Sequence, residues 1–261
     1  MKLFDAHNHI QDERLFPQID AVMERARCAG VVGMGVKGCR EDDWPRVVAI
    51  MEAYDGIHPA FGLHPWFIAN RSGRWLQTLE ELLANHPQAS VGEIGIDHAI
   101  GERDDADQEA VFLAQLDLAK RLERPVSIHC RQAWGRLIEL LDESGAPPRG
   151  MLIHCFGGSA EVALELVRRG GHISFSGSIT RPGNKKAGPA LRAVPADRLL
   201  IETDAPDILP STAAEGGLNE PALLRLVLAK AAELRGIPET ELAALTYRNA
   251  ERFFQQLDAG L

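Results

Sequence analysis

Short runs of apolar residues alternate with longer segments of helical period along the whole chain. Most of the short runs are apolar at nearly every position, which is typical of strands that are covered on both faces. Eight such runs occur, and we predict strands at residues 3–6, 30–36, 58–63, 90–94, 125–128, 150–153, 172–175 and 199–201. The sheet formed by these strands is expected to be parallel and buried.

The segments between these runs carry the apolar period of helices. Residues 108–122 show it most clearly, because Val111 and Leu116 belong to one broad apolar face. After the last strand, Asn219 is predicted to cap a helix that has Glu220 in its first turn. The helices that we predict lie at residues 19–29, 44–53, 78–85, 108–122, 160–168, 220–234 and 239–256.

Repetition of strand and helix predicts a (β/α)8 TIM barrel, an α/β fold in which helices surround a parallel barrel. The 261 residues fit one barrel of about 250 residues, followed by two extra C-terminal helices. We therefore predict a single domain over residues 1–261. A doubly wound open sheet is the alternative, because the number of strands does not prove that the sheet closes.

Charge and cysteine content narrow the class of protein. The net charge of −9 predicts a surface that repels nucleic acid and anionic membranes, so an anionic substrate needs local cations or metal. The four cysteines form no Cys-x-x-Cys pair, which fits a reducing compartment. No signal peptide and no membrane span are expected. These features favour a soluble cytoplasmic protein, and no obligatory protein partner is inferred.

The first predicted strand leads into the sequence "LFDAHNHI", which contains two histidines one residue apart. Successive side chains of a strand alternate between its faces, so His7 and His9 point to one side and Asn8 to the other. Two imidazoles on one face can both donate a nitrogen lone pair to one metal ion. Alone, however, such a pair is also compatible with solvated surface.

Other candidate ligands follow or end other predicted strands. The carboxyl ends of barrel strands converge on one mouth, where active sites of this architecture lie. Glu93 and Asp204 are next to apolar residues, where a carboxylate is costly unless it is paired or bound to metal. Together with the first pair, the polar residues at strand ends are His64, Glu93, His129, His154 and Asp204.

Six of these side chains are too many for one four-coordinate zinc ion. They suit two divalent ions about 3.5–4 Å apart that share one carboxylate, for which Glu93 on a middle strand is the natural bridge. His7, His9 and Asp204 are assigned to one ion, because the first and last strands of a barrel are neighbours. His129 and His154, from the neighbouring fifth and sixth strands, are assigned to the other. Imidazole ligands favour zinc, manganese, iron or nickel over magnesium.

These motifs together resemble the TatD family of metal-dependent deoxyribonucleases in the amidohydrolase superfamily. The resemblance rests on "DAHNHI", "FGLHPW", "VGEIGID", "VSIHCRQA", "HCFGGS", "LLIETDAP" and "NEPALL", and it extends to the C-terminal "YRNAERFF". It implies a (β/α)8 barrel, the same six ligands, two metal ions that include magnesium among the candidates, and hydrolysis of DNA phosphodiester bonds, often as a 3′-5′ exonuclease. It also implies that His64 and Arg131 face the substrate.

The chain departs from the family pattern where substrate contacts are expected. The family commonly has His-Pro-His, but this chain has Trp66 at the third position, and the basic residue often found shortly before "NEP" is absent. A hydrolase of a small amide, lactone or phosphoester is therefore the alternative function. A non-catalytic metal-binding scaffold ranks last, because Asp204 is present to orient an attacking water molecule and accept its proton.

Several other polar residues have both a structural and a functional interpretation. Arg131 could hold a phosphate or pair with an acid, and His64 could bind phosphate, protonate the leaving group or be structural. The loop "TRPGNKKAG" could guide an anionic chain to the mouth or simply be solvated. Cys130 and Cys155 are expected to point away from the ligands as small buried apolar side chains.

Overall fold

The computed structural model describes residues 1–214 and 216–254. Within them, eight parallel strands follow one another around the barrel in chain order, β1 to β8. The backbone N–H of Asp204 donates to the carbonyl of His7 at 3.0 Å, and that of His9 donates to Ala205 at 2.7 Å. These bonds join the end of the first strand to the segment after the last, so the prediction of a closed (β/α)8 barrel is confirmed and the open doubly wound sheet is wrong.

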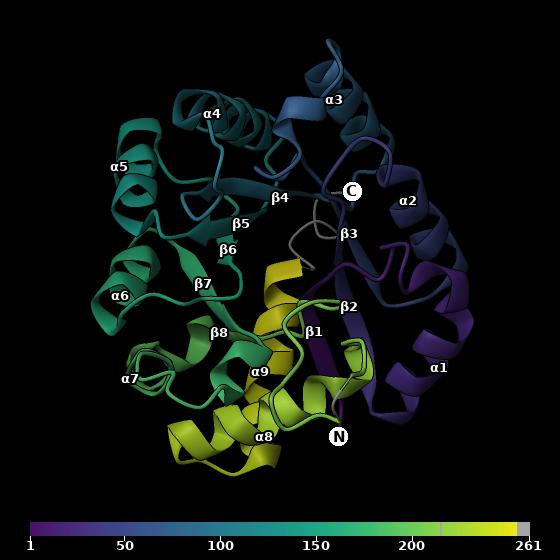
Figure 1. The fold of residues 1–261 in the computed structure, drawn as a ribbon, viewed down its shortest axis with the longest axis vertical. Coiled ribbons are helices and arrows are strands. Elements are labelled where there is room, and N and C mark those ends of the chain that lie inside the picture. The colour runs from purple at the N-terminus through teal and green to yellow at the C-terminus, as the bar shows by residue number, and fades with distance from the viewer. Residues whose placement is uncertain (215, 255–261) are drawn as a thin grey trace.

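Helices surround the strands, as Figure 1 shows in a view along the barrel. Each predicted strand and helix exists, with ends that differ by a few residues. The strands are β1 Leu3–Asn8, β2 Val31–Lys37, β3 Ile57–Phe61, β4 Ser90–Asp97, β5 Val126–Arg131, β6 Met151–Ile153, β7 Gly171–Phe175 and β8 Leu199–Ile201. The helices are α1 Ile19–Cys28, α2 Trp44–Ala53, α3 Trp75–Asn85, α4 Asp105–Arg121, α5 Trp134–Ser144, α6 Ala160–Arg168, α7 Ala187–Ala193, α8 Leu224–Arg235 and α9 Glu239–Phe254.

Strands β4 and β5 are longer than predicted, and this difference concerns the site. Their ladder continues through the pair Asp97 and Arg131, so Glu93 lies inside β4 and His129 inside β5. The two strands approach closely at Gly95, where an added Cβ would lie 1.9 Å from the carbonyl oxygen of His129. Only glycine permits this approach, which brings the side chains of the two strands together.

The prediction that Asn219 caps a helix is wrong. A short 3-10 turn, Pro221–Leu223, precedes α8, and its N-cap position belongs to Glu220. The buried Asn219 amide instead donates hydrogen bonds of 2.7 Å to the carbonyls of Thr203 and Asp207, which fixes the loop after β8. The Glu220 carboxylate pairs with Arg25 at 2.6 Å, so it joins this loop to α1.

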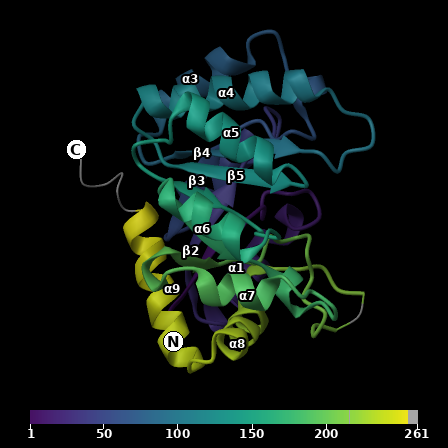
Figure 2. The same ribbon diagram turned by 90° about the vertical axis from the view of Figure 1, so that its left-hand side faces the viewer.

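Helix α9 covers the N-terminal end of the barrel, opposite the loops that follow β4 and β8 (Figure 2). Its Phe253 and Phe254 pack with Phe4 of β1 and Leu200 of β8 in an apolar cluster. Of the range predicted for this helix, residues 255–256 lie outside the described residues. Because one end of the barrel is filled in this way, the opposite end, where the strands finish, is left to hold polar side chains.

Candidate metal centre

All six predicted metal ligands meet at the C-terminal end of the barrel. Glu93 is buried at the centre of the group, with an exposed fraction of 1%. His7 is the last residue but one of β1, which ends at Asn8, and Asp204 follows β8. The other members are His9, His129 and His154, from the segment after β1, from β5 and from the segment after β6. The side chains predicted from separate strand ends therefore form one cluster.

The two carboxylate oxygens of Glu93 face different pairs of imidazoles. Oε2 lies 3.2 Å from Nε2 of both His7 and His9. Oε1 lies 2.6 Å from Nε2 of His154 and 3.1 Å from Nδ1 of His129. A carboxylate with one oxygen in each of two nitrogen pairs has the arrangement that a bridging ligand requires.

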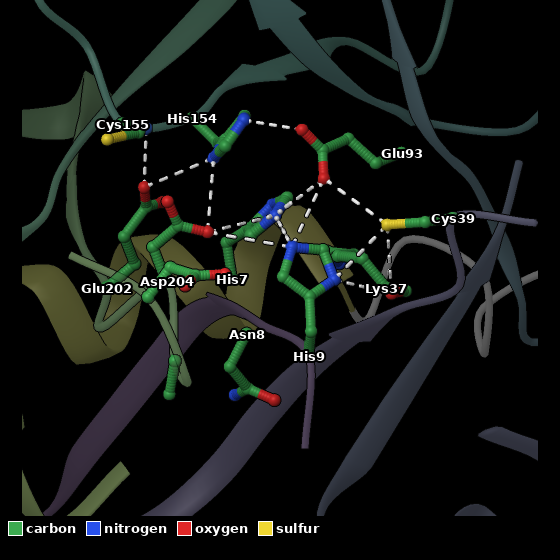
Figure 3. A network of polar contacts seen from close by, with 12 residues as sticks. His7, Asn8, His9, Lys37, Cys39, Glu93, His154, Cys155, Glu202 and Asp204 are labelled. Carbon is green, nitrogen blue, oxygen red and sulfur yellow. Dashed lines mark hydrogen bonds and ion pairs between the residues drawn. The ribbon is translucent and has the colours of Figure 1, made fainter. Parts of the chain in front are cut away.

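Asp204 completes the group that includes His7 and His9. Its Oδ1 lies 3.5 Å from Nε2 of His9 and 3.8 Å from Nε2 of His7, and the two Nε2 atoms lie 3.2 Å apart. Figure 3 shows Asp204 on one side of these imidazoles and Glu93 on the other. The side chains of His7, His9 and Asp204 can therefore hold one ion between them.

Partners behind the imidazoles determine which ring nitrogen faces the centre with a lone pair. Nδ1 of His9 lies 2.7 Å from the carbonyl oxygen of Lys37, an acceptor, so this nitrogen donates and Nε2 is free. Nε2 of His129 lies 3.0 Å from the Asp97 carboxylate, which leaves its Nδ1 free. In the same way, Nδ1 of His154 lies 3.5 Å from Glu202, and Nδ1 of His7 lies 3.0 Å from the Ser127 hydroxyl. These outer contacts suit the four histidines to metal ligation.

His64 differs from the four other imidazoles. Its Nδ1 accepts a hydrogen bond of 3.1 Å from the backbone N–H of Trp66. The proton of the neutral ring is therefore on Nε2, which points at Oε1 of Glu93 from 3.3 Å. Burial lowers the pKa of His64 to about 4, so the ring is a neutral hydrogen-bond donor near neutral pH.

The ionisation states within the cluster follow from burial and close charges. Burial disfavours a charge on Glu93, but the surrounding imidazoles, His154 above all, outweigh this and hold its pKa well below the usual range. Burial and the positive charge of His154, whose ring stacks on that of His7 at 3.8 Å, lower the pKa of His7. Burial also opposes charge on Asp204, yet its hydrogen bond with His9 keeps its pKa low. The cluster thus combines ionised carboxylates with at least one neutral imidazole.

Asp204 is held in place by its backbone as well as by its neighbours. Its φ of +57° lies in the left-handed region, which is uncommon for a residue other than glycine. The preceding Thr203 donates from its backbone N–H to the Asp5 carboxylate at 2.8 Å, which ties the segment after β8 to β1. Such conformations persist only where the surroundings fix them, and they occur often at functional sites.

Three residues near the cluster had no predicted role. Asp97 and Glu202 support His129 and His154, respectively. The Cys39 thiol lies 3.4 Å from Nδ1 of His9 and 3.8 Å from Oε2 of Glu93, as drawn in Figure 3. Asp97 is four residues after Glu93 in β4, and Glu202 is two residues before Asp204 in the segment after β8. An even spacing of this kind places side chains on one face of a strand. For Cys39 no comparable pattern exists in the sequence.

The two cysteines next to predicted ligands have different surroundings. Cys130 packs in the apolar core, as predicted, and burial raises the pKa of its thiol. Cys155 is only partly buried, and its sulfur lies 3.0 Å from the Ser176 hydroxyl, so the expected apolar environment is wrong for this residue. No group of metal-ligand geometry in the described part of the chain includes either thiol.

Arg131 ends β5 at the mouth, two residues after His129 and on the same face of the strand. Its side chain is exposed, and among residues 1–214 and 216–254 no carboxylate pairs with it. The alternative that an acid neutralises this arginine therefore has no support. In the basic loop after β7, residues 181–186 are exposed, and they include Arg181, Lys185 and Lys186.

The donor set fits divalent cations. Oε1 of Glu93 is fully buried and has no hydrogen bond of good geometry in the described structure, although imidazole nitrogens of His129 and His154 approach it closely. When these imidazoles are neutral, their lone pairs and the carboxylate oxygen point at one another, an arrangement that is repulsive unless a cation lies between them. Nitrogen and oxygen donors of this kind bind zinc, manganese, iron and nickel.

Four histidines and two carboxylates with these contacts at the mouth of a (β/α)8 barrel define a metal-dependent enzyme. The family model described as TatD related DNase matches residues 4–255, so this chain belongs to the TatD family, and it is a hydrolase of that family. The predicted family is thereby confirmed. The structure described contains no helix that is long and apolar enough to cross a membrane.

Individual relatives match over nearly their full length. The chain is 35% identical to the metal-dependent hydrolase YabD of Bacillus subtilis, over 97% of this chain and 99% of YabD. It is 33% identical to the 3'-5' ssDNA/RNA exonuclease TatD of Cronobacter sakazakii, over 97% of each chain. The crystal structure of YjjV, a TatD homologue from Escherichia coli K12, superimposes with a TM-score of 0.92 at 32% identity, covering 97% of this chain and 98% of YjjV.

Proposed function

We propose that this chain is a two-metal phosphodiesterase that hydrolyses unpaired DNA or RNA and acts as a 3′-5′ exonuclease. The observation that carries the proposal is the placement of the Glu93 carboxylate, which has one oxygen next to the nitrogens of each of two histidine pairs. The exonuclease relative at 33% identity supports the substrate class. One barrel spanning residues 1–261 would form the whole catalytic domain.

In this proposal His7, His9 and Asp204 would hold one ion, His129 and His154 would hold the other, and Glu93 would be shared between the two sites. His64 is left out of the ligand set because the hydrogen bond from Trp66 places a proton on the nitrogen that faces Glu93. The donors favour zinc, manganese, iron or nickel, and magnesium is the further candidate that the family suggests. When bound, the ions supply Lewis-acid stabilisation of the charge that develops on the phosphoryl oxygens and favour ionisation of the attacking water.

The protein side chains supply orientation and proton transfer. Asp204, ionised and fixed by its backbone, accepts a hydrogen bond from the attacking water and takes its proton through a carboxylate oxygen. His64 would donate from Nε2, the nitrogen on the Glu93 side of its neutral ring, to a phosphoryl oxygen bound next to Glu93. Arg131 uses its exposed planar guanidinium to hold a non-bridging phosphate oxygen. The exposed cations of the loop after β7 would raise the local concentration of an anionic chain.

A hydrolase of a small amide, lactone or phosphoester is the second candidate. It is favoured by Trp66, which replaces the second histidine of the family's His-Pro-His, and by the net charge of −9. A non-catalytic scaffold has no such support, because it would not require Asp204 to be fixed beside His7 and His9. The cytoplasmic location expected from the sequence stays a prediction.

A panel assay distinguishes these functions. Protein loaded with Mn²⁺, Mg²⁺ or Zn²⁺ would be given single-stranded DNA, duplex DNA, RNA, a lactone and a small phosphomonoester, with the Asp204→Asn variant as the control for contaminating nucleases. Release of mononucleotides from the 3′ end of unpaired strands, absent in the variant, is the expected result. Hydrolysis of the small esters alone would overturn the nuclease proposal in favour of the second candidate.

A further inference from the structure

Trp66 places an aromatic ring in solvent beside the candidate metal centre. It is the only aromatic residue among the exposed large apolar side chains in the described structure, with an exposed fraction of 54%. Tryptophan is normally highly buried because of its large apolar surface. An indole that is left exposed at the mouth of an enzyme barrel therefore needs an explanation other than packing.

The indole is exposed but not free to move. Its Nε1 donates a hydrogen bond of 2.7 Å to Oδ2 of Asp97, the same oxygen that lies 3.0 Å from His129. The ring also lies perpendicular to the His64 imidazole, with centroids 5.2 Å apart and planes at 88°. These contacts fix the plane of the indole relative to the candidate ligands.

A cavity of about 210 Å³ lies against this ring. Its walls are Trp66, Ala99, Ile100 and Arg131. It thus combines an aromatic surface, an aliphatic surface and the guanidinium for which we found no acidic partner among the described residues. This combination suits a flat, uncharged ring that is covalently attached to an anion, since the ring can stack while the anion meets Arg131.

We propose that Trp66 is a stacking platform for the nucleobase of an unpaired nucleotide whose phosphate is held by Arg131. This inference rests on the proposed function and adds to it a reason for acting on single strands. A base within a duplex has its faces covered by its neighbours, whereas an unpaired terminal base can turn onto the indole. Because every base has an aromatic face, the site should accept all four with modest preference.

Trp66 also has a positioning role through Asp97, and the two roles can be separated by choice of variant. Trp66→Phe keeps an aromatic face but removes the Nε1–H donor, whereas Trp66→Leu removes both. The substrates would be an unpaired oligonucleotide and the same oligonucleotide with abasic residues at its 3′ end, which keeps the phosphates and removes the stacking ring. Loss of the donor alone affects both substrates equally, so the ratio of their kcat/KM values reports stacking.

The expected result is a preference of the parent for the base-containing substrate by about 5- to 150-fold. Trp66→Phe should retain most of this preference, and Trp66→Leu should bring the ratio close to one. Trp75→Phe is the matched control, because Trp75 lines a different cavity with Ala69 and Arg71 and should leave both rates and the ratio unchanged. Circular dichroism of each variant verifies that it is folded.

Equilibrium binding gives a readout that does not depend on turnover. Titration of the Asp204→Asn protein with a short oligothymidylate should quench tryptophan fluorescence. The quenching should be absent in the double variant that also carries Trp66→Phe. Equal hydrolysis of the base-containing and abasic oligonucleotides by the parent would overturn the stacking proposal while leaving the nuclease function intact. If the parent hydrolysed neither oligonucleotide, that result would instead contradict the proposed function.

Discussion

The Asp97 carboxylate lies 3.0 Å from Nε2 of His129, on the side of the ring that faces away from Glu93. Burial opposes a charge on Asp97, but the hydrogen bond with His129 outweighs it and lowers the pKa of the carboxyl group to about 2. The carboxylate is thus ionised at all working pH values and fixes the His129 tautomer that offers Nδ1 to a metal.

Replacing Asp97 should weaken the ion assigned to His129 and His154. Asp97→Asn removes the charge behind His129, and loss of such an outer partner typically costs 10- to 100-fold in metal affinity. Isothermal titration of chelated protein with Zn²⁺ or Mn²⁺ measures the change. Asp105→Asn, which alters an exposed carboxylate of α4, is the control and should bind both ions as the parent does. Unchanged affinity of both ions in Asp97→Asn would show that the contact has no such role.

The sequence predicted that the six candidate ligands meet because their positions depend on one rule: parallel barrel strands all finish at the same mouth. Spacing places Asp97 and Glu202 on the face of a predicted ligand, but it could not show which histidine each supports, because that depends on side-chain distances between strands. Asn219 has the residue type of a helix cap, but its bonds to Thr203 and Asp207 determine its conformation. The ends of β4 and β5 were missed because cross-strand pairing, not composition, extends them.

Arg131→Ala should impair hydrolysis of phosphodiesters without loss of metal. Loss of a charge-assisted contact of about 1.5–3 kcal/mol corresponds to roughly a 10- to 150-fold lower kcat/KM. Arg131→Lys keeps the charge but not the planar fork, so its loss should be smaller. Steady-state kinetics with a single-stranded oligonucleotide and metal analysis of both variants make the test. Kinetics unchanged in Arg131→Ala would exclude this residue from phosphate binding and favour the small-substrate alternative.

His172 should make stability depend on pH independently of the metal centre. Burial, then the positive charge of Arg198, lowers the pKa of this β7 histidine to about 4. Between about pH 6.5 and 4 the unfolded imidazole binds a proton that the folded one does not, so stability falls as the pH falls. Lowering the pH from 7.5 to 5 should reduce the free energy of unfolding by ~2 kcal/mol through this histidine.

The variant His172→Leu isolates this contribution. Urea unfolding of parent and variant at pH 7.5 and pH 5 gives two differences in the free energy of unfolding, and other titrating groups cancel when parent and variant are compared. The parent should lose ~2 kcal/mol more than the variant between the two pH values. Equal losses would mean that His172 is not held neutral in the folded protein.

Metal content should be close to two divalent ions per chain. The two groups of donors around Glu93 each offer enough ligands for one ion, and purification without chelator should retain both. Elemental analysis measures the stoichiometry, and His154→Ala should reduce it by about one ion because this side chain belongs to one group in the proposal. Chelation should lower the melting temperature, since binding at 100 times Kd stabilises the folded state by about 2.7 kcal/mol. A folded protein that binds no divalent ion would contradict the centre altogether.

Asp204→Asn provides the most direct test of the proposed mechanism. The substitution nearly preserves size but removes the charge and the basic oxygen that accepts the proton of water. Loss of a positioned base typically lowers the rate by 10²- to 10⁴-fold, and weaker binding at His7 and His9 would add to this. The fold should persist, because asparagine tolerates the left-handed backbone that Asp204 adopts at a φ of +57°.

The control is Asp207→Asn, three residues later, where an exposed carboxylate pairs with Arg14 and lies outside the cluster. Measurements of kcat, metal stoichiometry and thermal unfolding on both variants separate loss of chemistry from loss of structure. Asp204→Asn should be almost inactive with a nearly normal melting temperature and with the ion on His129 and His154 retained, whereas Asp207→Asn should keep its activity. If Asp204→Asn turned over within about threefold of the parent at saturating metal, the lost base could not account for the expected decrease, and Asp204 would not be the proton acceptor.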